Sequence, residues 1–140
     1  MTQEDKKLLL IDLCTRLPWG VKVAIELSED KYTKAYDLRE IDNDSTAKLR
    51  QQVTIWDYGF YRSVISYPLI DCRPYLRPMS SMTEEEKEEY HKLCDNYYGI
   101  YFNSVESIDW LNAHHFDYRG LIEKGLALKA PEEMYKQKGE

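Results

Sequence analysis

The sequence predicts a single α+β domain in which an N-terminal helix and an antiparallel meander of four to five strands precede a helical C-terminal half. Three observations predict this fold. Apolar residues recur at helical spacing before Pro18, β-branched and aromatic segments separated by polar turns follow it, and helix-capping signals return after Pro78. We expect residues 1–130 to form the domain and residues 131–140 to form a mobile charged tail. Closure of the meander into a small barrel is an open alternative.

The first helix is expected to begin after Thr2, a potential N-cap with Asp5 at the third helical position. Leu9 and Leu13 lie on one face of this helix, which Pro18 must end because proline cannot donate a helical hydrogen bond. The apolar face should pack against the sheet.

Five segments rich in β-branched, aromatic or alternating apolar residues are expected strands, at 21–27, 33–41, 52–58, 63–67 and 70–76. Short polar turns join them without intervening helices, which favours antiparallel pairing and argues against a parallel sheet. Pro68, Pro74 and Pro78 cannot donate ladder hydrogen bonds, so the last two strands should be short or lie at edges.

Three more helices are expected in the second half, at 84–98, 103–114 and 118–124. Thr83 and Glu86 form a capping box for the first of them, and Gly99 should stop it. Asp117 can cap the last one, and Gly125 can close it in the left-handed conformation that favours glycine. Leu126 to Leu128 should then pack back on the domain.

Composition and charge exclude several classes of protein. With 19 basic and 25 acidic residues the chain carries a net charge of −6, which argues against a broad nucleic-acid-binding surface. No apolar run approaches the ~20 residues of a membrane span, and the charged N-terminus does not resemble a secretion signal. Three widely spaced cysteines without a CxxC pair are typical of buried thiols in a reducing compartment. We therefore expect a cytoplasmic protein without a cofactor.

A local basic and aromatic patch is the first candidate site. Arg62, Arg73 and Arg77 lie among several tyrosines, including Tyr75, and could bind a phosphate, a carboxylate or a nucleic-acid segment. The alternative is that Arg73 and Arg77 pair with the glutamates at the start of the second helix.

The segment around Trp110 supplies two further candidates. His114, His115 and Asp117 are metal-capable, although adjacent helical residues point about 100° apart and a helix-end or packing role is the alternative. Large aromatic and cationic residues such as Trp110, Tyr118 and Arg119 are enriched in binding hot spots, but they also close the cores of small domains.

Two stretches resemble segments of short uncharacterised proteins that are common in gut Bacteroidales genomes and in their phages and mobile elements. They are RPYLRPMSSMT at 73–83 and WLNAHHFDYRGLIEKGLAL at 110–128. The resemblance covers about a quarter of the chain. It implies a cytosolic accessory protein, carried by a phage or mobile element, that binds a host or phage component. It assigns no functional residue.

These observations leave three hypotheses. The first is a non-catalytic protein-binding module, with an unidentified protein partner, that binds through Arg73, Tyr75, Arg77, Trp110, His114, His115, Tyr118 and Arg119. The second is a small metal-dependent hydrolase centred on His114, His115 and Asp117. The third is local nucleic-acid binding through Arg62, Arg73 and Arg77. Nucleophile elbows, glycine-rich phosphate loops and HExxH patterns are absent from the sequence, so no enzyme class is indicated.

Overall fold

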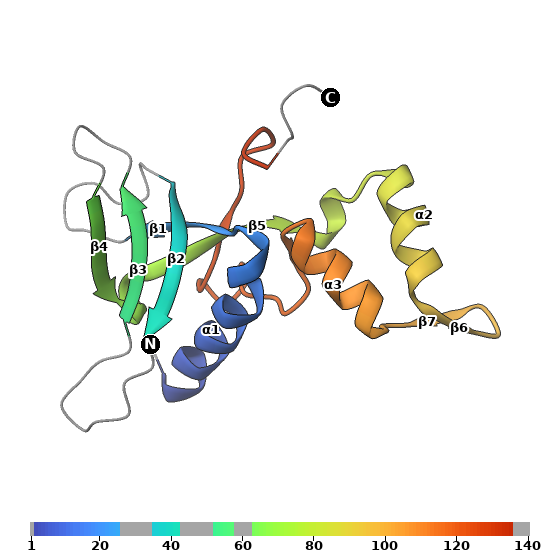
Figure 1. The fold of residues 1–140 in the computed structure, drawn as a ribbon. Coiled ribbons are helices and arrows are strands. Elements are labelled where there is room, and N and C mark those ends of the chain that lie inside the picture. Colours follow the sequence, from blue (N-terminus) through green and yellow to red (C-terminus); the bar gives the residue numbers. More distant parts are fainter. Residues whose placement is uncertain (1, 26–34, 43–51, 58–62, 136–140) are drawn as a thin grey trace.

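A computed structural model of the chain describes residues 2–25, 35–42, 52–57 and 63–135 (Figure 1). Its helices are α1 (Gln3–Arg16), α2 (Glu84–Leu93) and α3 (Val105–Ala113). Its strands are β1 (Lys22–Ile25), β2 (Tyr36–Asp42), β3 (Gln52–Asp57), β4 (Ser63–Pro68), β5 (Cys72–Pro78), β6 (Asp95–Tyr97), β7 (Ile100–Phe102), β8 (Phe116–Asp117) and β9 (Leu128–Lys129). The parts of the expected strands at 26–27, 33–34 and 58 lie outside the described residues.

The main sheet has the order β4-β3-β2-β1-β5-β8, with β9 also paired to β5. Strands β1 to β4 form the expected antiparallel meander, and β5 returns to pair antiparallel with β1. Within the described residues β4 pairs only with β3, so the sheet does not close into a barrel.

The expectation of a purely antiparallel sheet is wrong, because β8 and β9 both pair parallel with β5. Parallel neighbours need a long crossover connection. The chain supplies one between β5 and β8, consisting of α2, the β6–β7 hairpin and α3. The short polar turns of the first half do not predict this crossover connection.

Strand β5 is not an edge strand, contrary to the expectation from its prolines. β1 pairs with its first half, and β8 and β9 pair with its opposite edges. In the peptide between Leu76 and Arg77, the carbonyl accepts from the Ala130 N–H and the N–H donates to the His115 carbonyl on the other side. The prolines are tolerated because β8 and β9 each pair with β5 over two residues only.

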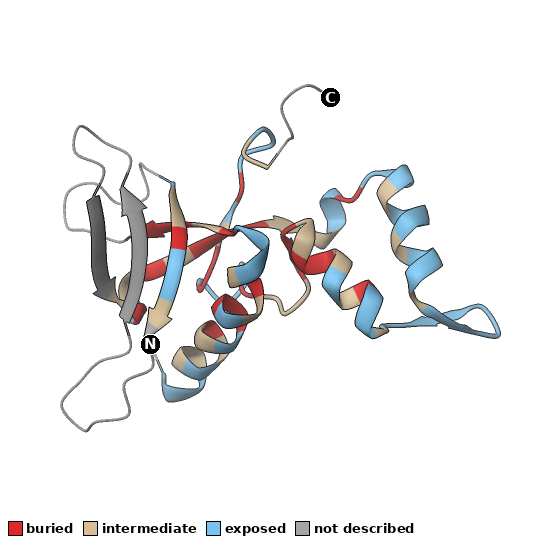
Figure 2. Ribbon diagram, in the orientation of Figure 1, coloured by how far each residue is buried: buried red, intermediate tan, exposed pale blue. Residues whose placement is uncertain are grey.

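Two layers cover the β1–β5 part of the sheet (Figure 2). Leu9 and Leu13 of α1 are fully buried in a core with β1, β2 and β5, as the helical spacing predicted. On the other face, Ala24 and Tyr75 pack with residues that follow β9. Alternation along each strand explains the division, because Val23 faces α1 whereas Ala24 faces the C-terminal segment.

The C-terminal segment is more closely packed than the expected tail. Tyr135 receives a hydrogen bond from the Lys22 backbone N–H at 2.9 Å and donates one to the Tyr75 carbonyl at 2.7 Å. Met134 packs in the same small cluster. Residues 131–135 therefore belong to the folded body, and residues 136–140 lie outside the described residues.

Two expected helices of the second half differ in the structure. Helix α2 begins at the predicted capping box but ends at Leu93, because Cys94 is extended and a hairpin follows. The expected helix at 118–124 is a series of turns. Its cause is local: the Asp117 carboxylate accepts the N–H groups of Leu121 and Ile122, and Gly120 has φ +75°, which is incompatible with a helix.

Only one of the three cysteines is buried as expected. Cys72 is buried, Cys94 is half-buried and Cys14 is exposed. None of the helices in the described ranges is long and apolar enough to cross a membrane.

Residues 84–113, comprising α2, β6, β7 and α3, project from the sheet and are named the arm here (Figure 1). The base of the arm has a small core of its own, in which Met82, Leu111 and Phe116 are buried. The outer part of the arm is largely exposed (Figure 2).

A fully buried ion pair within α1 also contacts the segment that follows the arm. Arg16 Nε lies 2.8 Å from an Asp12 carboxylate oxygen, and both side chains are completely buried. Arg16 Nη2 donates to the Phe116 carbonyl at 2.7 Å, and Arg119 Nη1 donates to the second Asp12 oxygen at 2.9 Å. We call Asp12, Arg16, Tyr118 and Arg119 the buried hub.

We predict that Asp12→Ala lowers the free energy of unfolding by about 3–5 kcal/mol, because it leaves the buried Arg16 guanidinium without its counter-charge. Urea denaturation measures this loss. The double variant Asp12→Leu/Arg16→Met should be less destabilised than Asp12→Ala, because no unpaired charge remains. Glu123→Ala, at an exposed acid, is the control. A loss below about 1 kcal/mol for Asp12→Ala would show that the pair is dispensable.

Candidate functional site

Arg77 serves the structure at the base of the arm. Its guanidinium forms two hydrogen bonds with the Glu86 carboxylate, at 2.9 and 2.8 Å, and lies over the Phe116 ring at 4.1 Å. Burial alone would raise the pKa of Glu86, but the bonds from Arg77 and the Thr83 cap outweigh it, so this pKa is lowered. The alternative in which Arg77 pairs with the start of α2 is thus the one observed.

The other members of the basic patch are not gathered around a common site. Arg73 Nη1 donates to the carbonyls of Ile70 and Cys72, at 2.7 and 2.9 Å, rather than to a glutamate of α2. The Tyr75 ring is buried under the C-terminal segment. Arg62 lies outside the described residues. A phosphate-binding cluster of Arg73 and Arg77 is not what the structure shows.

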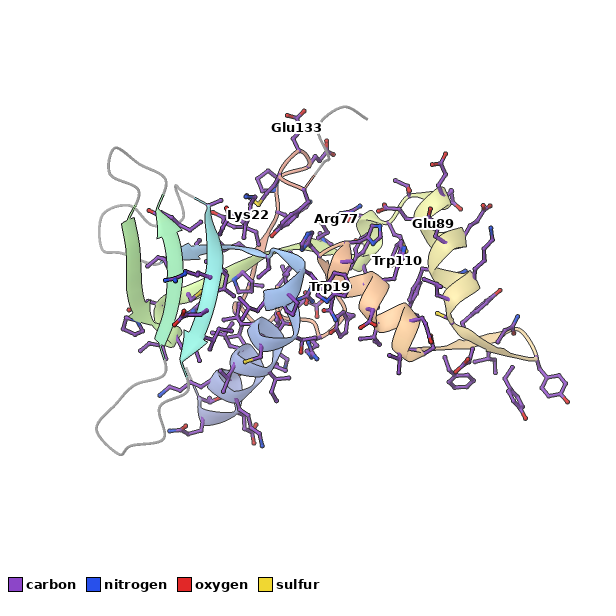
Figure 3. All side chains as sticks on the ribbon, viewed as in Figure 1. Trp19, Lys22, Arg77, Glu89, Trp110 and Glu133 are labelled. Carbon is purple, nitrogen blue, oxygen red and sulfur yellow. The ribbon has the colours of Figure 1, made fainter. Side chains whose placement is uncertain are left out.

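Trp110 packs inside the arm rather than on a free surface. Its ring stacks on His114 at a centroid distance of 4.0 Å, and on Tyr90 and Phe116 at 5.8 and 5.7 Å. Figure 3 shows Trp110 and Glu89 on the facing sides of α3 and α2, where the indole N–H donates to the Glu89 carboxylate at 3.4 Å. The indole joins the two helices.

Tyr118 and Arg119 belong to the buried hub. The Tyr118 ring lies beneath two guanidinium groups, with Arg16 Cζ at 5.2 Å and Arg119 Cζ at 4.7 Å from its centroid. Its hydroxyl donates to the Asn112 side chain at 3.0 Å. Cation–π contacts of this kind hold the segment after α3 against α1.

His114, His115 and Asp117 do not converge on one point. The His114 ring stacks on Trp110, the His115 ring stacks on Tyr135 at 3.7 Å, and the Asp117 carboxylate caps two backbone N–H groups. Among the described residues, no group of three His, Cys, Asp or Glu side chains is arranged to hold a metal ion. The packing alternative accounts for all three side chains.

His115 is an unusual residue in two respects. Its φ of +62° lies in the left-handed region, and its ring is buried with no hydrogen-bond partner for Nδ1 among the described residues. Burial, followed by the positive charges of Arg16, Arg77 and Lys22 and by His114, lowers its pKa to about 4. The imidazole is therefore neutral at pH 7.

A pocket of about 520 Å³ lies between the start of α2 and the C-terminal segment. Its charged lining consists of Arg77 and Glu86, which are paired with each other, and of Lys129 and Glu132. Tyr135 also lines it, and its hydroxyl is bonded to backbone. Arg77, Glu86 and Tyr135 are thus already used by the fold.

The hairpin of β6 and β7 carries the most exposed apolar side chains of the described residues. Asp95 pairs with Phe102 and Tyr97 with Ile100, so these four lie on one side of the hairpin. Tyr97, Ile100 and Phe102 are 69%, 60% and 54% exposed, and the adjacent Val105 at the start of α3 is 76% exposed. We call Tyr97, Ile100, Phe102 and Val105 the hairpin face.

The opposite side of the hairpin rests on α2. Tyr101 points to that side and stacks on His91 at 4.2 Å. Tyr98 and Gly99 form the two-residue turn, with φ of +52° and +83°, the signs that a type I′ turn requires. Tyr98, at the tip, is 97% exposed.

The hairpin face was not predicted from the sequence, because a strand of three residues has too little pattern to identify. The available signal was Gly99 between two aromatic pairs, which is compatible with a hairpin turn as well as with a helix stop. Exposure of these residues, rather than burial, could not be read from their apolar character.

We predict that His115 makes the protein less stable as the pH falls from about 6.5 to about 4. The unfolded chain binds a proton at this residue with the ordinary pKa of 6.5, whereas the folded chain binds it only near 4. The unfolded state therefore holds more protons in this window, and up to about 3 kcal/mol of stability is lost on acidification.

The comparison is the free energy of unfolding against pH for the wild type and His115→Asn, since asparagine tolerates the left-handed conformation without titrating. Carboxylates titrate equally in both proteins. The variant should lose less stability between pH 6.5 and 4, and parallel profiles would contradict a depressed pKa at His115.

Comparison with known proteins adds no functional assignment to this geometry. No protein-family model, no curated protein and no solved structure matches the chain. The resemblance to Bacteroidales and phage proteins therefore stays a prediction.

Proposed function

We propose that the protein is a non-catalytic protein-binding module that binds its partner through the hairpin face and the tip residue Tyr98. The observation that carries the proposal is the exposure of Tyr97, Ile100 and Phe102 on one side of the hairpin. A contiguous exposed apolar surface with polar surroundings is a mark of an interaction site. Tyrosine and phenylalanine are also enriched at protein interfaces.

The arm holds the hairpin face in place before any partner binds. The Ser104 cap of α3 donates its hydroxyl proton to the Leu93 carbonyl at the end of α2, and Tyr90 of α2 donates to the Asn103 side chain. The Tyr101–His91 stack supports the hairpin from behind. Such preorganisation lowers the entropy cost of binding.

The residues that the sequence suggested as a binding site support the proposal indirectly, because they hold the arm in place. Arg77, Trp110, Tyr118 and Arg119 hold the arm and the buried hub together, and none needs a ligand to satisfy it. A two-stranded hairpin is only marginally stable in water by itself. The chain therefore uses its dense aromatic segment to support a projection whose outer residues add nothing to the core.

Photo-crosslinking tests the proposal. With p-benzoylphenylalanine in place of Tyr98, the protein should crosslink to a discrete partner in a lysate of a gut Bacteroidales species. The same group in place of Trp19, which is 41% exposed on the body, is the matched control and should give no such product.

The triple variant Tyr97→Ser/Ile100→Ser/Phe102→Ser should abolish the crosslink made from position 98. Its free energy of unfolding should change by no more than about 1 kcal/mol, because these side chains are mostly outside the core. A crosslink that survives the triple substitution, or equal crosslinking from position 19, would contradict the hairpin face as the binding surface.

A further inference from the structure

We infer that the partner of the hairpin face is a protein surface with an apolar centre and a rim of lysine and arginine residues. This inference rests on the proposed function and adds the chemistry of the partner to it. Three observations lead to it: the location of the chain's net charge, the acids that border the hairpin face, and the poor fit of the other occupants.

The net charge of the protein is concentrated on the arm, from α2 to the first turn of α3. Residues 84–109 contain two lysines and eight acids, a net charge of −6, which equals the net charge of the whole chain. The remainder holds 17 basic and 17 acidic residues. The acids of the arm are Glu84, Glu85, Glu86, Glu88, Glu89, Asp95, Glu106 and Asp109.

Three of these acids border the hairpin face directly. Asp95 lies on the same side of the hairpin as Phe102, with which it pairs. Glu106 follows Val105, and Asp109 lies one helical turn beyond Val105 on the same side of α3. All three are exposed, and none has an ion-pair partner in the part of the chain that the structure describes.

The remaining acids of the arm are partly used by the fold. Glu86 is bound by Arg77, Glu89 accepts the indole N–H of Trp110, and Glu84 pairs with Lys87. Glu85 and Glu88 of α2 are exposed and have no ion-pair partner among the described residues. Asp95, Glu106 and Asp109 lie where a partner would form the rim of an interface. Charges at the rim steer encounter and select the partner, whereas the apolar centre supplies most of the affinity.

Other occupants fit this surface less well. A second copy of the chain would place one arm of charge −6 against another, which like-charge repulsion opposes. Nucleic acid and anionic lipid are disfavoured by the same sign of charge. A basic protein surface is complementary in both its apolar and its charged part.

Three fluorescent helical peptides of equal length serve as probes. The first is amphipathic with leucine and lysine, the second is amphipathic with leucine and glutamate, and the third carries lysine with serine in place of leucine. Fluorescence anisotropy measures their binding to the full chain. The leucine–lysine peptide should bind at least about tenfold more tightly than the other two.

Raising the salt from about 0.1 M to about 1 M shortens the Debye length from about 10 Å to about 3 Å and should weaken this binding. The variant Asp95→Asn/Glu106→Gln/Asp109→Asn should weaken it about tenfold. The matched variant Glu123→Gln/Glu132→Gln/Glu133→Gln removes three exposed acids from the body and should bind like the wild type.

Equal binding of the leucine–glutamate peptide, salt-independent binding, or equal weakening by both charge variants would overturn the inference. The inference would also be overturned if none of the three peptides bound. The same holds if sedimentation showed a dimer of the wild-type chain that the triple serine variant converts to a monomer. The crosslink made from position 98 is a separate measurement that tests the proposed function. If it persists while the peptides fail, the proposed function stands without the basic partner, and if it is absent, the proposed function fails as well.

Discussion

The buried contact between Asp12 and Arg16 is the interaction on which the arrangement of this protein depends. Arg16 is fully buried, so its charge must be neutralised inside the protein, and its Nε and Nη2 groups find acceptors there, whereas Nη1 has none among the described residues. Asp12 on the same helix supplies the charge, and the Phe116 carbonyl, 100 residues further along the chain, supplies an acceptor. This requirement fixes the end of the arm against α1 and places β8 beside β5.

The composition of the segment from Trp110 to Arg119 follows from that constraint. Its aromatic rings lie against guanidinium groups and against each other, and its histidines and Asp117 end the helix or pack. The segment from Trp110 to Arg119 has the residue types of a binding or metal site, but in the structure it connects the arm to the rest of the domain. The most exposed apolar side chains of the described residues lie instead on the hairpin at the far end of the arm.

Body and arm differ in the balance of their charges as well as in their burial. The body encloses a core between α1, the sheet and the C-terminal segment, and its charges balance. The arm carries the excess of acids and an apolar surface that the fold does not cover. Water-exposed aromatic residues contribute little to folding, so their concentration at one projection points to a role outside the chain.

The sequence by itself determined the elements that depend on near neighbours. The capping boxes at Thr2 and Thr83 start α1 and α2 as predicted, and alternation places the strands of the meander, because both act within a few residues. Only the tertiary structure decided the interior position of β5, the packing of Tyr135, the turns at 118–124 and the exposure of the hairpin face. These depend on contacts between distant segments, and an apolar residue has the same local pattern whether a partner from elsewhere in the chain covers it or leaves it to another protein.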